Sequence, residues 1–349
     1  MNRNRISKHV CLLVSVVLVA LSAGGSSAVE WERVQSRFTV ENDVGMTDQH
    51  YTNGLRYEAF SARQGGGKYE PGGHLTFGLR TWLNYFKGTP NTEDVQRGWA
   101  IGQNFYTPAD IHTPDLQVND RPYAAILYLG RIWKLKTDNA TQWTEVNLGI
   151  AGPLALGESV QKGWHEVINI AQPQGWDNQI STWPVIQWST RVRTKNWGPL
   201  KIGEATKTVK KTELLGFSAL GSLSAGSVMV SGQGGLAMQA GYNTRQVEAG
   251  IPDTFVADGP RKPGPNWHLF AEATVRYTLR PWSIFLDGTP AWRYPRSHHV
   301  TGETGFEEYE FALHFGGDSY ELVVSHVRRG SEFKGADAHG FWSASLILY

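Results

Sequence analysis

Apolar and polar residues alternate one by one through long stretches of this chain. The stretch 267–280, WHLFAEATVRYTLR, has an apolar residue at every second position and mostly polar or charged residues between them. The same pattern recurs in YEFALHF (309–315) and VIQWSTRVRT (185–194). A period of two is that of a β-strand whose two faces meet different surroundings. Because the stretches are about as long as a tilted strand that crosses a bilayer, we predict membrane-spanning strands.

The pattern predicts about twelve strands along the whole chain. They fall near 36–43, 51–62, 97–106, 121–134, 141–152, 182–194, 213–225, 229–243, 266–280, 307–316, 319–329 and 340–349. Bacterial single-chain barrels have an even number of strands. We therefore expect an all-β fold, a closed antiparallel transmembrane β-barrel of a single domain that ends on the aromatic Tyr349. The alternative is a secreted β-sandwich, whose strands are usually shorter.

Two segments depart from the alternation. HLTFGLRTWLNYF (74–86) has apolar residues at helical spacing, so we expect a helix or insert there, on the periplasmic side. The second segment, 157–170, follows Gly152-Pro153 and is closed by Pro173, which predicts a short surface helix. On this helix Glu158, Gln161 and His165 would share one face.

The first 28 residues predict a secretory signal peptide. A basic start is followed by the apolar run 10–21 and by small residues, with cleavage expected after Ala28 and a barrel domain over 29–349. An uncleaved anchor helix is the alternative, but the apolar run is short for one. Beyond residue 28 no apolar run reaches the length of about 18 residues that a transmembrane helix needs. A membrane protein of this kind must therefore be a closed barrel.

Composition and charge exclude several classes of protein and of active site. The chain has 39 Gly, 14 Trp, 13 Tyr and 14 Phe but only 40% hydrophobic residues, which suits alternating strands better than a soluble α/β core. Its single cysteine, Cys11, lies in the expected signal peptide, so disulfides, thiolate metal sites and a cysteine nucleophile are excluded from the mature chain. A formal net charge of +1 argues against a nucleic-acid partner.

Oxygen-bearing side chains gather in the first loop, within ENDVGMTDQHYTNGLR (41–56). With the amino end in the periplasm, this loop, the connection 104–123 and the stretch after the fifth strand would all lie at the outer rim. Carboxylate and amide oxygens are ligands for Ca²⁺, and Asn42, Asp43 and Asp48 are the candidates. The alternative is that these Asx residues only form turns.

A set of short motifs resembles the outer-membrane lipid A 3′-O-deacylase family. The match runs in the same order over most of residues 38–180 and consists of END (41–43), TD (47–48), YTNG (51–54), GQN (102–104), YTP (106–108), DRP (120–122), Gly152-Pro153, and Gln161 with His165. Any one of these motifs is a weak signal, but END, TDxxYTNG and YTP together are fairly specific.

The resemblance implies a barrel of twelve strands in the bacterial outer membrane and a calcium-dependent esterase. Its substrate would be lipid A, the anchor of lipopolysaccharide in the outer leaflet, from which it removes the 3′-linked acyloxyacyl chain. His165 matches the family's general base, which activates water, and Gln161 lies on the same helix. Asn42 and Asp43 match the pair associated with calcium and the polarised carbonyl, and Thr52 matches the hydroxyl of the family's Tyr-Thr motif.

One departure from the family pattern concerns substrate phosphate. Some members carry a lysine after the Tyr-Thr/Ser-Pro motif, but this chain has no lysine between Lys87 and Lys134. We expect Arg121 to supply the positive charge instead.

Two other functions stay open at this point. An outer-membrane phospholipase would share the barrel and the calcium but needs a serine beside its histidine, and the chain has no G-x-S-x-G motif. The other alternative is a non-enzymatic barrel, a channel or an adhesin. We expect a monomer embedded in the membrane.

Overall fold

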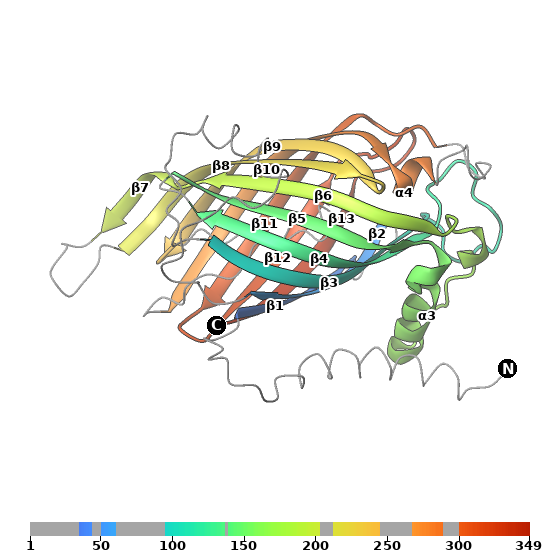
Figure 1. The fold of residues 1–349 in the computed structure, drawn as a ribbon, viewed down its shortest axis with the longest axis horizontal. Helices are drawn as coiled ribbons and strands as arrows, with labels where there is room; N and C mark the ends of the chain where they lie inside the picture. Colours follow the sequence, from blue (N-terminus) through green and yellow to red (C-terminus); the bar gives the residue numbers. More distant parts are fainter. Residues whose placement is uncertain are drawn as a thin grey trace.

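The described residues form a single antiparallel sheet that closes into a barrel (Figure 1). The computed structural model describes residues 35–43, 50–60, 95–136, 139–202, 212–244, 267–288 and 300–349. The predicted closed β-barrel is confirmed, and the sandwich alternative is wrong. The expected signal peptide, the helix expected over 74–86 and Asp48 lie outside the described residues.

The strands follow the predicted ranges to within a few residues. They are β1 (Gln35–Asn42), β2 (His50–Phe60), β3 (Val95–Thr107), β4 (Ala124–Lys136), β5 (Ala140–Ala151), β6 (Trp183–Thr194), β7 (Trp197–Ile202), β8 (Thr212–Gly226), β9 (Met229–Tyr242), β10 (His268–Ser283), β11 (Gly305–Gly316), β12 (Tyr320–Arg329) and β13 (His339–Leu348). Each strand pairs with its neighbours in sequence, except that β6 and β7 both pair with β8 and not with each other, and β1 also pairs with β13.

Strand β7 was not predicted, and it explains how thirteen strands make a barrel of twelve positions. The last part of β8, from Leu220 to Gly226, pairs with β6, whereas its first part, from Thr212 to Phe217, pairs with β7. Thus β6 and β7 are two pieces of one wall position, and the β6–β8 pairing closes the barrel. Because β7 is short and contains Pro199, it shows no alternation that could have revealed it.

The two faces of the wall are reversed relative to a water-soluble barrel. On β10, Leu269, Val275 and Leu279 are exposed, whereas the residues of opposite parity, such as Glu272 and Arg276, are buried in the lumen. Buried charges there are paired, as in Arg193–Glu272 at 2.8 Å. Other luminal pairs are Arg276–Glu310, Arg329–Glu308 and Arg56–Glu145, each at 2.7 Å. Charges can be buried only with such partners, and an apolar outer face fits lipid.

The two ends of the barrel differ. Ser36 pairs with Leu348, so the start of β1 and the end of β13 share one end, where the C-terminus lies at the left of Figure 1. We call this the terminal end. The other end, called the helix end, carries α3 (Gly157–Ile168), the short α4 (Ile284–Asp287) and the connection between β3 and β4. The three polar segments expected at one rim therefore do share one end.

Helix α3 lies outside the barrel wall and runs away from it rather than along the strands (Figure 1). The predicted surface helix is thus confirmed. Among the residues described here, no helix is long and apolar enough to cross a membrane.

Candidate functional site between helix α3 and the barrel wall

The chain leaves β5 through a fixed turn that starts α3 at a defined place on the wall. Gly152 has φ +83°, and its amide donates to Ala125 O at 2.9 Å. A Cβ at this position would lie 2.7 Å from Ser181 O, so only glycine fits. One turn later, Gln103 of β3 donates from Nε2 to Ala155 O at 2.6 Å. The GQN and Gly-Pro motifs therefore act together to dock the start of the helix.

The buried face of α3 is small and polar rather than apolar. Gly157, Gln161 and His165 are its buried residues, at i, i+4 and i+8 on one side of the helix. A Cβ on Gly157 would lie 2.5 Å from the Cβ of Ala125, so the helix approaches the wall closely. Glu158 is not part of this face, because it is partly exposed and forms an ion pair with Lys162 at 2.6 Å.

Gln161 is held by a tryptophan from the segment that follows the helix. Trp176 lies in η3 (Trp176–Asn178), is fully buried, and donates from Nε1 to Gln161 Oε1 at 2.8 Å. Its ring also packs against Phe105 of β3 and Tyr123, in one apolar cluster with Ala155. This cluster fixes α3 onto the outer surface of β3 and β4.

The turn after α3 determines the tautomer of His165. Asn169 adopts the left-handed conformation with φ 57°, and the amide of Ile170 donates to His165 O at 3.0 Å. The reversed chain brings Ala171 O within hydrogen-bond distance of His165 Nδ1. A carbonyl only accepts, so Nδ1 carries the proton and Nε2 carries the lone pair. The ring is thus arranged as a base at Nε2.

Replacing Trp176 with phenylalanine should loosen α3 without disturbing the barrel. The ring packing would be kept, but the buried Gln161 Oε1 would lose its donor, which costs about 1–3 kcal/mol. We expect amide hydrogen exchange over 157–168 to accelerate roughly ten- to hundred-fold, since about 1.4 kcal/mol is a factor of ten. The matched control is Trp164→Phe on the exposed side of the helix. Equal exchange in both variants would contradict the role assigned to Trp176.

The first loop brings three of the predicted residues together at the ends of β1 and β2. Asn42 ends β1, and the amide of the buried Asp43 donates to Thr52 O at 3.4 Å. The pairing of β2 with β3 shifts register between Tyr51 and Asn53, and this bulge contains Thr52. Thr52 and Thr107 of β3 share a hydrogen bond between their hydroxyls at 2.7 Å.

Strand β3 connects this group to the helix. Gln103 reaches outward to the segment that starts α3, and Thr107 lies four residues further along the same strand. Residues separated by an even number share a face of a strand, so Thr107 and its partner Thr52 lie on the same outer surface as Gln103. Asn42, Asp43, Thr52, Gln161 and His165 therefore all lie at the helix end, and β3 contacts both Thr52 and the segment that starts α3.

The donor atoms of this group suit calcium. Asp43 has a carboxylate, Asn42 and Asn53 have amide oxygens, and Thr52 has a hydroxyl. Asn53 lies opposite Asn42 across β1 and β2, and its Oδ1 is buried without a hydrogen-bond partner in the described part of the chain. Within that part, no three His, Cys, Asp or Glu residues cluster closely enough to hold a metal. A site with few carboxylates and several neutral oxygen donors suits Ca²⁺ better than zinc.

Arg121, expected to supply positive charge to a substrate phosphate, is engaged by other protein groups. Its guanidinium is buried, forms an ion pair with Glu332 at 2.9 Å, and lies between the rings of Tyr106 and Phe333 at 5.3 and 5.8 Å. Burial lowers the pKa of Arg121 from its ordinary value, although the Glu332 carboxylate opposes this shift. The side chain is engaged in the barrel mouth, so the structure does not support a contact with a lipid phosphate.

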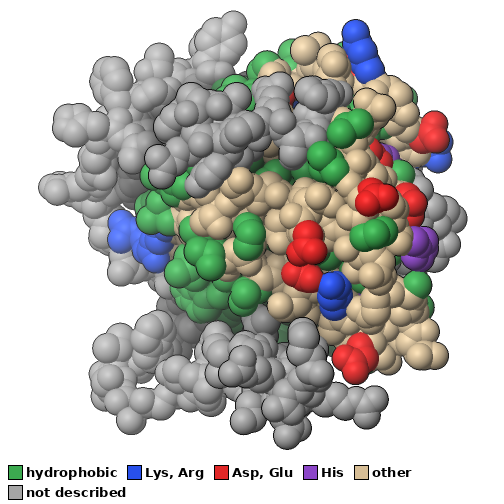
Figure 2. Space-filling view, turned by 90° about the vertical axis from the view of Figure 1, so that its right-hand side faces the viewer, with side chains coloured by type: hydrophobic (Ala, Val, Ile, Leu, Met, Phe, Trp, Pro, Cys, Tyr) green, Lys and Arg blue, Asp and Glu red, His purple; other side chains and the backbone are tan. Residues whose placement is uncertain are grey.

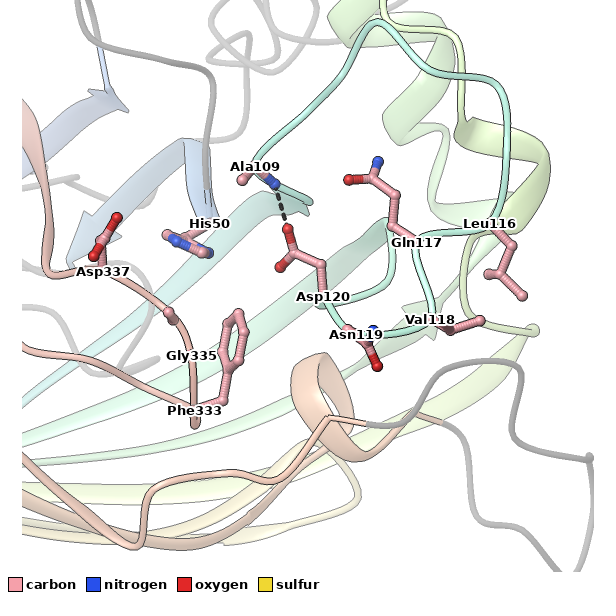
Figure 3. A pocket seen from close by; sticks show the side chains of 11 residues that line it. His50, Ala109, Leu116, Gln117, Val118, Asn119, Asp120, Phe333, Gly335 and Asp337 are labelled. Atoms are coloured by element: carbon pink, nitrogen blue, oxygen red, sulfur yellow. Dashed lines mark hydrogen bonds between the residues drawn. The ribbon is translucent and has the colours of Figure 1, made fainter.

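A separate cavity of about 480 Å³ opens at the helix end (Figure 3). His50 and Phe333 border it together with the loops 116–120 and 335–337. Asp120 has a structural part here, because its Oδ2 accepts from the Ala109 amide at 2.7 Å. Among the described residues that line the cavity, neither His165 nor Gln161 occurs, so it is distinct from the candidate site.

Sequence reasoning missed three groups that shape the site. Thr107 lies in the YTP motif, which could have revealed it. Trp176 reaches Gln161 across an irregular segment, and the Ala171 carbonyl acts through its backbone, so neither gave a signal in the pattern of residue types.

Comparisons with known proteins found one family model and solved structures of outer-membrane barrels. The family model described as outer membrane protein LpxR matches residues 10–348. The solved structure of LpxR from Salmonella typhimurium has a TM-score of 0.67 and 16% identity, covering 90% of this chain and 99% of that chain. The β-domain of the Bordetella autotransporter BrkA has a TM-score of 0.40 and 11% identity, covering 90% and 98% of the two chains. A search of curated protein sequences found no match.

Proposed function

Because this chain belongs to the outer membrane protein LpxR family, we propose that it is a calcium-dependent esterase that removes the 3′-linked acyloxyacyl chain of lipid A. The protein is a β-barrel of the bacterial outer membrane. The observation that carries the proposal is that an imidazole of defined tautomer, His165, lies at the same end of the barrel as the oxygen-rich group Asn42, Asp43 and Thr52, with β3 in contact with both Thr52 and the segment that starts α3.

The chemistry assigned to His165 is that of a general base. Nε2 takes a proton from a water molecule as the water oxygen bonds to the ester carbonyl carbon. The ester C–O bond then breaks, and the protonated imidazole returns the proton to the departing sugar oxygen. The products are a free fatty acid and the 3′ hydroxyl. Ala171 O keeps the ring oriented in both steps, because the Nδ1–H bond is present in either protonation state.

The oxygen-rich group would hold the calcium ion. When bound, calcium supplies positive charge beside the carbonyl oxygen, where negative charge develops. Asp43 and Asn42 are the proposed ligands, with Asp48 of the same loop as a third. Thr52 is positioned by Thr107 and lies next to these ligands.

The proposed orientation puts the helix end at the outer leaflet and the terminal end in the periplasm. The site then faces lipid A, whose ester bonds lie where sugar and acyl chains meet. The proposed catalytic and calcium-binding residues all come from one chain. They are His165, Asn42, Asp43, Asp48 and Thr52, and we therefore propose a monomer.

The observations favour this function over the two alternatives. Ion pairs such as Arg193–Glu272 occupy the lumen, which opposes an open channel. The serine of α3, Ser159, is exposed rather than on the buried face with His165, which gives no support to a serine esterase.

Calcium removal tests the proposal directly. Purified protein in detergent would be incubated with lipid A, and the products would be analysed by mass spectrometry. We expect loss of the 3′ acyloxyacyl group, no loss after treatment with a calcium chelator, and recovery on addition of Ca²⁺ but not of Mg²⁺, which prefers a smaller octahedral site. Lipid A of unchanged mass under every condition would refute the esterase, and full activity in the chelator would refute the calcium requirement.

A further inference from the structure

Helix α3 and its two flanks carry an exposed apolar surface that the proposed chemistry does not use. Val167 is 71% exposed and Leu154 is 61% exposed. The members of this surface, called the α3 stripe, are Leu154, Leu156, Trp164, Val167, Ile168 and Ile170. Water would be in contact with all of them if the helix lay in solvent, which is unfavourable for so many large apolar side chains in one short segment.

The stripe is a continuous side of the helix. At about 100° per residue, Trp164, Val167 and Ile168 fall within roughly one third of the circumference. This sector lies next to the buried face with Gln161 and His165. The charged residues Glu158, Lys162 and Glu166 occupy the remaining side. The helix therefore has three sides, one against the wall, one apolar and one charged.

The stripe continues the apolar outer surface of the barrel. Leu129 on β4 and Leu148 on β5 are exposed at 60% and 58%. Nearer the helix end on the same two strands, Leu127 and Ile150 pack against the cluster of Trp176 and Ala155 beneath α3. An apolar surface thus runs from the wall, past the foot of α3, to the helix. Figure 2, which looks onto the helix end, shows hydrophobic side chains gathered toward one side of the described surface.

We propose that the α3 stripe is immersed in the acyl chains of the outer leaflet, with Glu158, Lys162 and Glu166 at the level of the head groups. The occupant is lipid because the barrel wall on which the stripe continues is itself the lipid-facing surface. The crosswise direction of α3 relative to the strands is that of an interfacial amphipathic helix (Figure 1). This inference rests on the outer-membrane location of the barrel and not on the esterase activity.

The consequence is a defined entry side. The face with His165 lies between the wall and a helix side covered by acyl chains, so a lipid can reach the imidazole by lateral movement without leaving the leaflet. The charged side of α3 faces water, on the side of the helix away from the acyl chains.

The test uses site-directed spin labels on a chain that starts at Val29 and therefore lacks Cys11. Labels at Val167→Cys and Leu154→Cys report on the stripe, Leu148→Cys is the lipid-exposed reference, and Glu166→Cys is the matched control beside Val167. The proteins are reconstituted in palmitoyl-oleoyl phosphatidylcholine vesicles, and collisions with oxygen and with a water-soluble nickel chelate are compared. Retention of the compact heat-modifiable form on gels identifies folded barrels.

At positions 167 and 154 we expect the spin label to collide with oxygen several-fold more often than with the nickel chelate, as at the lipid-exposed reference 148. At position 166 we expect collisions with the nickel chelate to exceed those with oxygen. Nickel access at 167 equal to that at 166 would overturn the proposal. Protection of 167 from both reagents would also overturn it, because it would indicate a protein occupant. Activity is not part of the readout, so an inactive protein with lipid-exposed labels would refute the esterase alone.

Discussion

Replacing His165 with alanine is expected to abolish removal of the acyloxyacyl chain while the barrel stays folded. Loss of a general base costs typically 10²–10⁴-fold in rate, and here Nε2 is the group proposed to take the proton from water. The side chain lies outside the barrel wall, so the ion pairs of the lumen are untouched. The measurement is the rate of fatty acid release from lipid A by the purified variant, followed by mass spectrometry.

The neighbouring Glu166 provides the matched control. It is exposed on the charged side of α3, so Glu166→Ala should retain the wild-type rate. His165→Asn would keep a polar side chain but cannot accept the proton, and we expect it to be as inactive as the alanine variant. A rate within a few-fold of wild type in either His165 variant would exclude the imidazole as the base.

The second large effect is expected on stability, from Glu332→Gln. Glu332 is 2% exposed in the connection between β12 and β13, and its carboxylate pairs with Arg121, Arg280 and Arg329. The glutamine amide cannot balance these three guanidinium groups. Removing one partner of a buried ion pair costs about 3–5 kcal/mol. Urea unfolding in detergent micelles, followed by tryptophan fluorescence, should show a loss of this size.

The pH dependence of this effect follows from the pKa of Glu332. Burial alone would raise that pKa, but Arg121, Arg280 and Arg329 together hold it well below 4.5. A carboxyl whose pKa is lowered on folding stabilises the protein fully above its unfolded pKa, and this stabilisation is lost as the pH falls through the folded value. The difference between wild type and Glu332→Gln should therefore be constant near neutral pH and shrink in acid.

Asp337→Asn is the matched control for Glu332. Asp337 lies in the same connection but is exposed, so its neutralisation should change stability by no more than a few tenths of a kcal/mol. If Glu332→Gln were as stable as Asp337→Asn, the buried network would not hold the barrel mouth together as described.

The network also explains why one motif residue was misinterpreted. DRP (120–122) resembled a family motif, and Arg121 was expected to replace the lysine that this chain lacks between Lys87 and Lys134. The acid that binds Arg121 is Glu332, which lies 211 positions later in the chain. No spacing or local pattern connects the two residues, and only the closure of the barrel brings the connection between β3 and β4 near the connection between β12 and β13.

The sequence by itself determined the barrel and the helix. Alternation with a period of two is a local property, so it marked every wall strand except the short β7, where Pro199 interrupts the pattern. The face shared by Gln161 and His165 was also readable, because both positions belong to one helix of regular period.

Only the tertiary structure decided how the site is arranged. The bulge at Thr52, the Trp176 bond to Gln161, the Ala171 carbonyl at His165 and the pairing of Arg121 with Glu332 are contacts between separate segments or backbone atoms. Side-chain type and spacing predict the secondary structure of one segment. They do not predict which distant segment supplies a hydrogen-bond donor or a charge, because that depends on the order and register in which the strands pair.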